Sequence, residues 1–155
     1  MTADSSAPDE RLADLFPSGG TPRVVAEIWA TVDLDRVLDR FVAAEGLTSE
    51  ALPDDDLLGA RAGLVRPPSR HPIAILEPAT EGRLAALLAR NGEGMVGQYI
   101  EAPEALERFT DRNTERGRRF SRVASGPFGR EALAEGPVAG PLLVLVEASA
   151  GTIDR

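Results

Sequence analysis

Residues 73–94 read IAILEPATEGRLAALLARNGEG and combine the signals of a strand, a helix and a turn. The apolar run at 73–76 ends at Glu77-Pro78, because proline holds the residue before it extended. Three leucines then recur at the spacing of one buried helical face: Leu84, Leu87 and Leu88. Asn91-Gly92 is typical of a helix end. The stretch therefore predicts a short strand followed by a helix over 80–91.

A similar order of elements occurs on both sides of this stretch. Upstream, the residues predict a strand, a helix and two strands: 23–32, 34–45, 57–65 and 72–76. Downstream, they predict a strand, a helix and three strands: 95–101, 103–117, 119–124, 131–138 and 141–147. Asp33 and Gly46 are placed to cap the first of these helices. We predict an α+β fold of two βαβββ modules that form a cupped mixed sheet with helices on the outer side, although residue identity between the halves is too low to show a repeat.

The length of 155 residues favours one compact domain. We place module one at 23–78, the connecting helix at 80–91 and module two at 95–148. Residues 1–22 mix small, polar and acidic residues and predict a flexible N-terminal tail, and 149–155 are expected to form a C-terminal tail. The N-terminal tail contains one small apolar group: Leu12, Leu15 and Phe16.

The charge of the chain argues against some partners. It has 25 acidic and 17 basic residues, a net charge of −8, and its arginines are scattered among the acids. Nucleic acid and anionic membranes need a clustered positive patch, so neither is an expected partner. The absence of cysteine excludes disulfides, thiolate metal sites and a cysteine nucleophile. No apolar run approaches the roughly 20 residues of a membrane helix and no signal-peptide pattern opens the chain, so we expect a soluble, cytoplasmic protein.

The predicted strand at 23–32 has two different faces. One face is small and apolar, and we expect it to pack beneath the helix over 34–45; it contains Ala26, Ile28, Ala30 and Val32. The other face mixes a carboxylate, an indole and a hydroxyl, as the wall of a pocket would; it contains Val25, Glu27, Trp29 and Thr31.

The element order and the stretch LEPATEGRLAALLARNGEG resemble the vicinal oxygen chelate superfamily of glyoxalase and bleomycin-resistance proteins. Within it, the stretch is most similar to the methylmalonyl-CoA epimerases, through Glu77-Pro78 and Gly92-Glu93-Gly94. The resemblance covers 23–148 in element order and only 73–94 in motif. It implies a single glyoxalase-like domain in which two modules cup a cavity, and commonly a homodimer. High Arg, Ala, Gly and Pro content also indicates a GC-rich bacterial genome and favours a role in specialised metabolism.

The resemblance also implies a divalent metal site, which can be compared position by position. Ungapped counts place three of the family's four ligands at Ala74, Gly97 and Val144. The fourth falls on Ala26 without a gap, and on Glu27 if the following turn is one residue shorter. We prefer Glu27, because the ungapped match would turn this carboxylate towards the helix and bury it unpaired. One carboxylate cannot hold a divalent ion, so we predict a metal-free member with no cofactor.

Glu27 is our candidate catalytic residue, as a general base or acid that moves a proton next to a carbonyl. The alternatives for Glu27 are a hydrogen bond to a ligand or a place at the sheet rim. The candidate ligand-binding residues are Trp29, Thr31, Gln98 and Tyr99. Gln98 and Tyr99 lie on the matching strand of module two, and Gly97 leaves open which of them faces the cavity. The alternatives are a core aromatic for Tyr99 and a residue at the sheet rim for Gln98.

Other polar residues have simpler explanations. His71, the only histidine, precedes a strand and is more typical of an exposed loop than of a catalyst. The run Asp54-Asp55-Asp56 lacks the spacing and the glycine of a calcium loop, so we expect a solvated loop. Gly92-Glu93-Gly94 lacks the lysine of a phosphate-binding loop and is expected to be a turn between modules.

Two functions from different classes remain. The first is a metal-independent isomerase, cyclase or lyase that acts by proton transfer on a hydrophobic carbonyl-bearing metabolite. The second is a protein that binds and sequesters a small apolar or aromatic molecule, as antibiotic-resistance members of the superfamily do. A metal-dependent epimerase with unrecognised ligands is a further alternative. The ligand itself is not named by the sequence.

Overall fold

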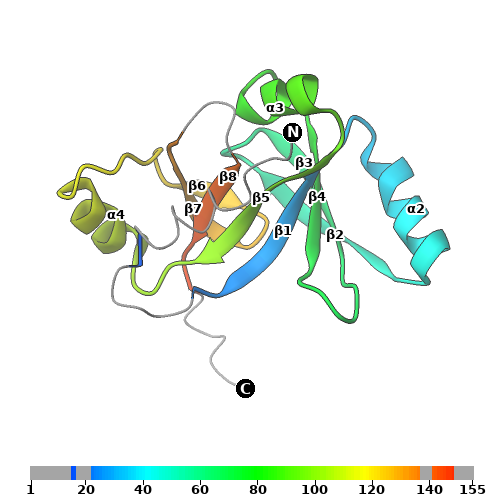
Figure 1. Ribbon diagram of the computed structural model, residues 1–155, viewed down its shortest axis with the longest axis horizontal. Coiled ribbons are helices and arrows are strands. Elements are labelled where there is room, and N and C mark those ends of the chain that lie inside the picture. The colour runs from blue at the N-terminus through cyan, green and yellow to red at the C-terminus, as the bar shows by residue number, and fades with distance from the viewer. Residues whose placement is uncertain (1–14, 17–21, 137–140, 149–155) are drawn as a thin grey trace, which may run out of the picture.

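The structure is a computed structural model that describes residues 15–16, 22–136 and 141–148. In this part of the chain, eight strands form one mixed sheet in the order β2-β3-β4-β1-β5-β8-β7-β6 (Figure 1). The strands are β1 (Val24–Ala30), β2 (Ser49–Asp55), β3 (Ala60–Val65), β4 (Ile73–Pro78), β5 (Gly94–Glu101), β6 (Ala124–Gly126), β7 (Gly129–Ala134) and β8 (Leu142–Val146). The helices are α2 (Leu34–Glu45), α3 (Arg83–Asn91) and α4 (Leu106–Thr114).

The two halves of the sheet have the same topology. In each half the first strand pairs in parallel with the last, β1 with β4 and β5 with β8. The halves meet where β1 pairs antiparallel with β5, with Ala26 opposite Tyr99 and Glu27 opposite Gln98. The predicted α+β class with a cupped mixed sheet is confirmed.

The sheet curves until its two edge strands approach each other. The amide of Asp56, just after β2, donates to the carbonyl of Ser125 in β6 at 2.9 Å. We call this meeting of β2 and β6 the seam. The sheet is therefore a nearly closed barrel, with an inner and an outer face.

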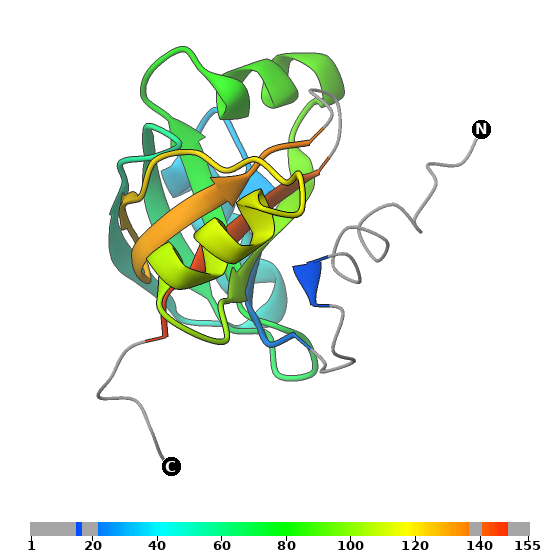
Figure 2. The same cartoon turned by 90° about the vertical axis from the view of Figure 1, so that its left-hand side faces the viewer.

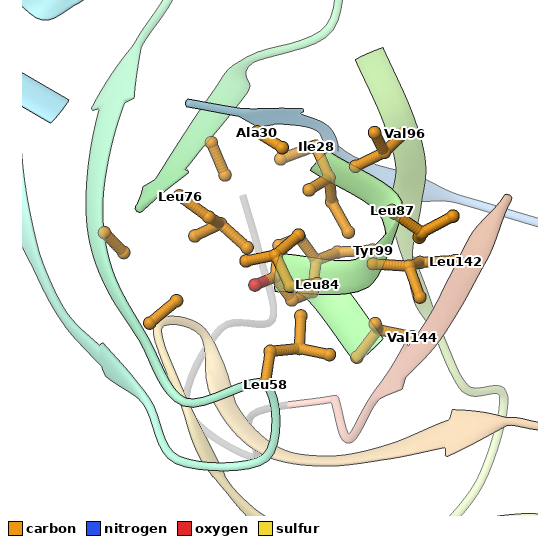
Figure 3. Close-up of a cluster of buried hydrophobic side chains, with 14 of the residues drawn as sticks. Ile28, Ala30, Leu58, Leu76, Leu84, Leu87, Val96, Tyr99, Leu142 and Val144 are labelled. Atoms are coloured by element: carbon orange, nitrogen blue, oxygen red, sulfur yellow. The ribbon is translucent and has the colours of Figure 1, made fainter. Parts of the chain in front are cut away.

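The helices cover different parts of this barrel (Figures 1 and 2). On the outer face, α2 packs through Phe41 against Trp29, with ring centroids 5.6 Å apart. Phe109 of α4 packs against Phe16 at 5.4 Å, also on the outer face. The leucines of α3 instead join the buried cluster inside the barrel, where Leu84 lies beside Tyr99 (Figure 3). Two helices thus follow the predicted outer placement, and α3 covers the apolar interior.

One prediction for β1 is wrong. Its apolar face does not lie beneath α2: Ala26, Ile28 and Ala30 are fully buried inside the barrel with the leucines of α3. The face that carries Trp29 lies outside, against α2. Alternation along a strand separates two faces but does not say which one becomes concave, because that depends on how the whole sheet curves.

Sequence signals gave the ends of α2 correctly. The Asp33 carboxylate accepts from the amide of Arg36 at 3.2 Å, and Gly46 ends the helix with φ of 67°. A further acceptor at the start of α2 was not predicted: Glu77, at the end of β4, accepts from the amide of Leu34 at 2.9 Å. Such an acceptor satisfies an amide that the helix itself leaves free.

Module two contains the same arrangement. Glu147, just after β8, accepts from the amide of Leu106 at the start of α4 at 3.0 Å. An arginine from the neighbouring strand binds each of these acids: Arg61 contacts Glu77 at 3.3 Å, and Arg130 contacts Glu147 at 2.8 Å. The repeat that residue identity does not show is thus present in equivalent interactions.

Two segments differ from the prediction. Asp55 was expected in a solvated loop, but it ends β2 and is fully buried. The strand expected over 119–124 is mostly absent: a single bridge joins Phe120 to Ala134, and regular pairing starts only at Ala124. Local composition predicts neither outcome, since pairing of these residues depends on the strand beside them.

Most of the two expected tails, residues 1–14, 17–21 and 149–155, lies outside the described residues. Leu15 and Phe16 are described, and they pack against the α4 side of the sheet; Leu15 is 5% exposed. This part of the predicted flexible tail therefore contacts the domain. No described helix is long and apolar enough to span a membrane.

Candidate functional site

An open pocket of about 570 Å³ lies beside β1 on the outer side of the sheet. It combines a carboxylate, an imidazole, a guanidinium and a hydroxyl with three apolar side chains. Its lining residues are Glu27, Pro68, Ser69, Arg70, His71, Ile73 and Met95. The pocket thus joins the candidate catalytic carboxylate to the only histidine of the sequence.

The sheet holds Glu27 at the wall of this pocket. Its carboxylate Oε2 accepts from Nε2 of Gln98, directly opposite on β5, at 3.1 Å. Its backbone amide donates to the carbonyl of Pro72 at 2.8 Å, which fixes the neighbouring end of the β3–β4 loop. His71, next to Pro72, is exposed, and Arg70 of the same loop is paired with Glu45 at 3.1 Å. Carboxylates and imidazoles are both common general acids and bases in enzymes.

The other predicted ligand-binding residues lie elsewhere. Trp29 packs on α2, and its buried Nε1 has no hydrogen-bond partner in the described part of the chain. Thr31 is fully buried and donates its hydroxyl to Glu93 at 2.9 Å. Tyr99 is fully buried inside the barrel. Of the five predicted site residues, the structure brings together Glu27 and Gln98.

The carboxylate of Glu93 holds Thr31 and its neighbours in place. In addition to Thr31, its carboxylate accepts from Arg36 at 2.6 Å and from the amide of Val32 at 3.0 Å. The hydrogen bond from Arg36 is the largest of the effects that lower the pKa of Glu93, to about 2. The Gly92-Glu93-Gly94 turn therefore anchors the connection between β1 and α2.

A second cluster of polar groups lies inside the barrel, and sequence reasoning missed two of its three members. The hydroxyl of Tyr99 donates to Oδ2 of Asp55 at 2.7 Å, and the amide of Leu58 donates to Oδ1 at 2.7 Å. The carboxyl of Glu131 lies close to Asp55 and is fully buried. Among the described residues, neither of its oxygens has a partner with the geometry of a hydrogen bond.

The apolar surroundings raise the pKa of two members of the cluster, Glu131 and Tyr99. Burial raises the pKa of Glu131 to about 10, and the neighbouring Asp55 carboxyl adds to the rise. Burial also raises the pKa of Tyr99 well above its usual value, with Asp55 contributing. In the sequence Glu131 is marked only by the small apolar run that follows it at 132–134, and Glu135 ends the same run. Nothing in the sequence connects it with Asp55.

The residues at the family's metal positions do not fit a divalent ion. Ala26, Ala74 and Val144 are fully buried among apolar side chains and have no donor atoms. At Gly97 a Cβ would overlap the carbonyl of Leu142, so this backbone has no room for a ligating side chain. Within the described ranges, no group of three acids or histidines could hold a metal.

Ala26 and Glu27, the two residues weighed as the family-equivalent position, lie on opposite faces of β1. Ala26 faces the interior together with Ala74 and Val144, whereas Glu27 is on the opposite face of β1. The expected cost of burying Glu27 does not arise, because it lies at an open pocket and is hydrogen-bonded by Gln98.

Of three comparisons with known proteins, the one with solved structures finds this fold. No protein-family model matches the sequence, and no curated protein matches it. A solved structure of methylmalonyl-CoA epimerase from Streptomyces coelicolor, in complex with 2-nitronate-propionyl-CoA, superposes with a TM-score of 0.71 at 20% identity, over 84% of this chain and 97% of that one.

Two other solved structures give the same result. Methylmalonyl-CoA epimerase from Mycobacterium tuberculosis has a TM-score of 0.70 at 22% identity, over 81% of this chain and 87% of that one. A hypothetical protein from Bacillus halodurans has a TM-score of 0.70 at 19% identity, over 87% and 100%. The chain therefore has the vicinal oxygen chelate fold, in the form seen in the methylmalonyl-CoA epimerases.

Proposed function

We propose that this protein is a metal-independent enzyme that moves a proton next to the carbonyl of a small hydrophobic metabolite in the Glu27 pocket. The observation that carries the proposal is the position of Glu27 at the wall of an open pocket that also contains His71. The epimerase names of the structural neighbours support this reaction class, because epimerisation beside a carbonyl proceeds by removal and return of a proton.

In this reaction Glu27 removes a proton from the carbon beside the carbonyl. The C–H electron pair forms a carbon–carbon double bond, and the carbonyl π electrons move to oxygen. The donors of Ser69, Arg70 and His71 in the same pocket are available to stabilise that oxygen. Return of the proton at the same or another atom gives the isomer, and loss of a leaving group gives the elimination product. Gln98 orients the Glu27 carboxylate through its amide.

The experiment measures incorporation of solvent deuterium into methylmalonyl-CoA by NMR, with EDTA present throughout. Wild type should exchange the proton beside the thioester carbonyl. Glu27→Gln should lower the rate at least about 100-fold with little change in affinity, because the amide cannot accept the proton. Glu50→Gln, a change on exposed β2, is the matched control and should exchange at the wild-type rate. Exchange that depends on added metal and ignores Glu27 would contradict the proposal.

Binding without turnover is the second candidate. Met95 at the pocket is 48% exposed, and an exposed flexible apolar side chain is typical of adaptable binding surfaces. In this case neither wild type nor Glu27→Gln would exchange deuterium, and Glu27→Gln would change only ligand affinity in calorimetry. The homodimer, the cytoplasmic location and the role in bacterial specialised metabolism stay predictions; light scattering of the purified protein tests the first.

A further inference from the structure

The buried acids Asp55 and Glu131 belong to strands that are far apart in the sequence and meet inside the barrel. Asp55 ends β2 and Glu131 lies in β7, and both are 0% exposed. Tyr99, from β5, binds Asp55. Apolar residues surround the group, among them Leu58, which Figure 3 shows below Tyr99. Neither acid takes part in the Glu27 pocket.

In the part of the chain that the structure describes, no positive charge balances this pair. Among the described residues, no arginine forms an ion pair with either acid, and the neighbouring Arg130 of β7 pairs instead with Glu107 and Glu147. The other charged group that acts on Glu131 is Asp56, which is also an acid. Two ionised carboxylates cannot lie side by side in an apolar interior without a cation, so one must hold a proton.

The hydrogen bonds show which acid holds it. Each oxygen of Asp55 accepts one hydrogen bond, from the Tyr99 hydroxyl and from the Leu58 amide, so both oxygens act as acceptors. Glu131 accepts none in the described structure, so its carboxyl is the neutral member. Its rise in pKa has the direction that this assignment requires.

The pair lies at the seam where the barrel closes. Asp56, next to Asp55, donates the one described backbone hydrogen bond that crosses from the end of β2 to β6, to Ser125. Glu131 lies in the hairpin of β6 and β7, against Gly126, where a Cβ would overlap its carboxyl. The two acids therefore lie on opposite sides of the seam, and few backbone hydrogen bonds hold the seam together.

We propose that the pair of Asp55 and Glu131 holds a single proton, carried by Glu131, and that this proton keeps the seam between β2 and β6 closed. When the proton leaves, two negative charges face each other across the seam, and the strands separate where one backbone bond crosses. Separation exposes the apolar interior around Tyr99 and Leu58. The pair thus forms a proton-dependent gate to the inside of the barrel, independent of the Glu27 pocket.

The test follows two atoms by NMR on the full chain. The side-chain carboxyl of Glu131, assigned by its loss in Glu131→Gln, should titrate several pH units above the exposed glutamates. Hydrogen exchange of the Asp56 amide shows whether the seam is closed. It is expressed as a protection factor, relative to the intrinsic exchange rate at each pH. Between pH 7.5 and 9.5 protection at Asp56 should fall at least tenfold in wild type and stay constant in Glu131→Gln. The amide of Thr31, bonded to Leu76 on the far side of β1, is the control and should not change.

A second variant keeps the test decisive if Glu131→Gln does not fold. Asp55→Asn removes the neighbouring charge while leaving an acceptor for Tyr99, so Glu131 should titrate at lower pH than in wild type. The proposal is overturned if Glu131 titrates together with the exposed glutamates. It is also overturned if protection at Asp56 falls equally in wild type and Glu131→Gln, or if Asp55→Asn leaves the titration of Glu131 unchanged.

Discussion

The buried carboxyl of Glu131 makes the stability of the fold depend on pH. Glu131 is buried beside Asp55, and no described arginine pairs with it. Its carboxyl is therefore neutral in the folded state. In the unfolded chain it titrates at its ordinary value of 4.5, whereas in the folded chain its pKa is about 10. Between these values the folded state holds a proton that the unfolded state releases. The contribution of Glu131 to stability is therefore complete below pH 4.5 and is lost progressively as the pH rises towards 10.

We predict that Glu131→Gln removes this pH dependence, because the amide is neutral in both states. A single proton can change the free energy of unfolding by up to about 1.4 kcal/mol per pH unit. The stability of the variant relative to wild type should therefore increase steadily from pH 5 to pH 9. Urea denaturation at several pH values measures it. Parallel curves for the two proteins would show that Glu131 titrates alike in the folded and unfolded states.

At the scale of elements, the two outer helices are attached to the sheet in the same way. Glu77 and Glu147 stand at the ends of equivalent strands, β4 and β8, and each accepts from the first amide of its module's helix. A carboxylate at this place also interacts favourably with the positive end of the helix dipole. The attachment therefore depends on one acid in each module.

We predict that Glu77→Ala and Glu147→Ala each lower the free energy of unfolding by about 0.5–2 kcal/mol, the usual cost of losing a helix cap. The two sites share no contacts, so the double variant should show the sum of both losses within about 0.5 kcal/mol. Chemical denaturation of the three variants measures this. Glu135→Ala is a control, since this acid caps no helix. A double variant no less stable than one of the single variants would show that the helices are held by packing alone.

At the scale of the whole molecule, Tyr99 links the junction of the two modules with the seam. Its ring lies on β5 in the interior cluster, 5.0 Å from Phe128, and its hydroxyl reaches Asp55 at the far edge of the sheet. β5 is also the strand through which the modules pair. One side chain thus ties the centre of the sheet to the edge where the barrel closes.

We predict that Tyr99→Phe keeps the ring packing but destabilises the protein by about 1–3 kcal/mol, because Asp55 loses one of the two bonds that satisfy it when ionised. Guanidinium denaturation measures the change. Exchange protection at the Asp56 amide should fall in the same variant, whereas the Thr31 amide should keep its protection. Unchanged stability would mean that the hydroxyl does not support the closure of the barrel.

The sequence by itself determined the order of most elements and several of their ends; β2, where a loop was expected, and the segment 119–124 are the exceptions. Apolar residues at helical spacing, Asp33 before α2 and Gly46 after it act between neighbours along the chain, so they can be read without knowing the fold. The resemblance carried by 73–94 indicated the two-module architecture, which the structure confirms. Gln98 was also correctly placed on the strand that matches Glu27.

Only the tertiary structure decided which face of β1 is concave and what Asp55 does. The curvature of eight paired strands turns Ala26 inward and Glu27 outward, and alternation alone permits either result. The contact between Asp55 and Glu131, and the pocket that joins Glu27 to His71, unite residues whose separation in sequence carries no signal. Periodicity records what neighbouring residues prefer, whereas these contacts arise when strand register and closure of the sheet fix positions in space.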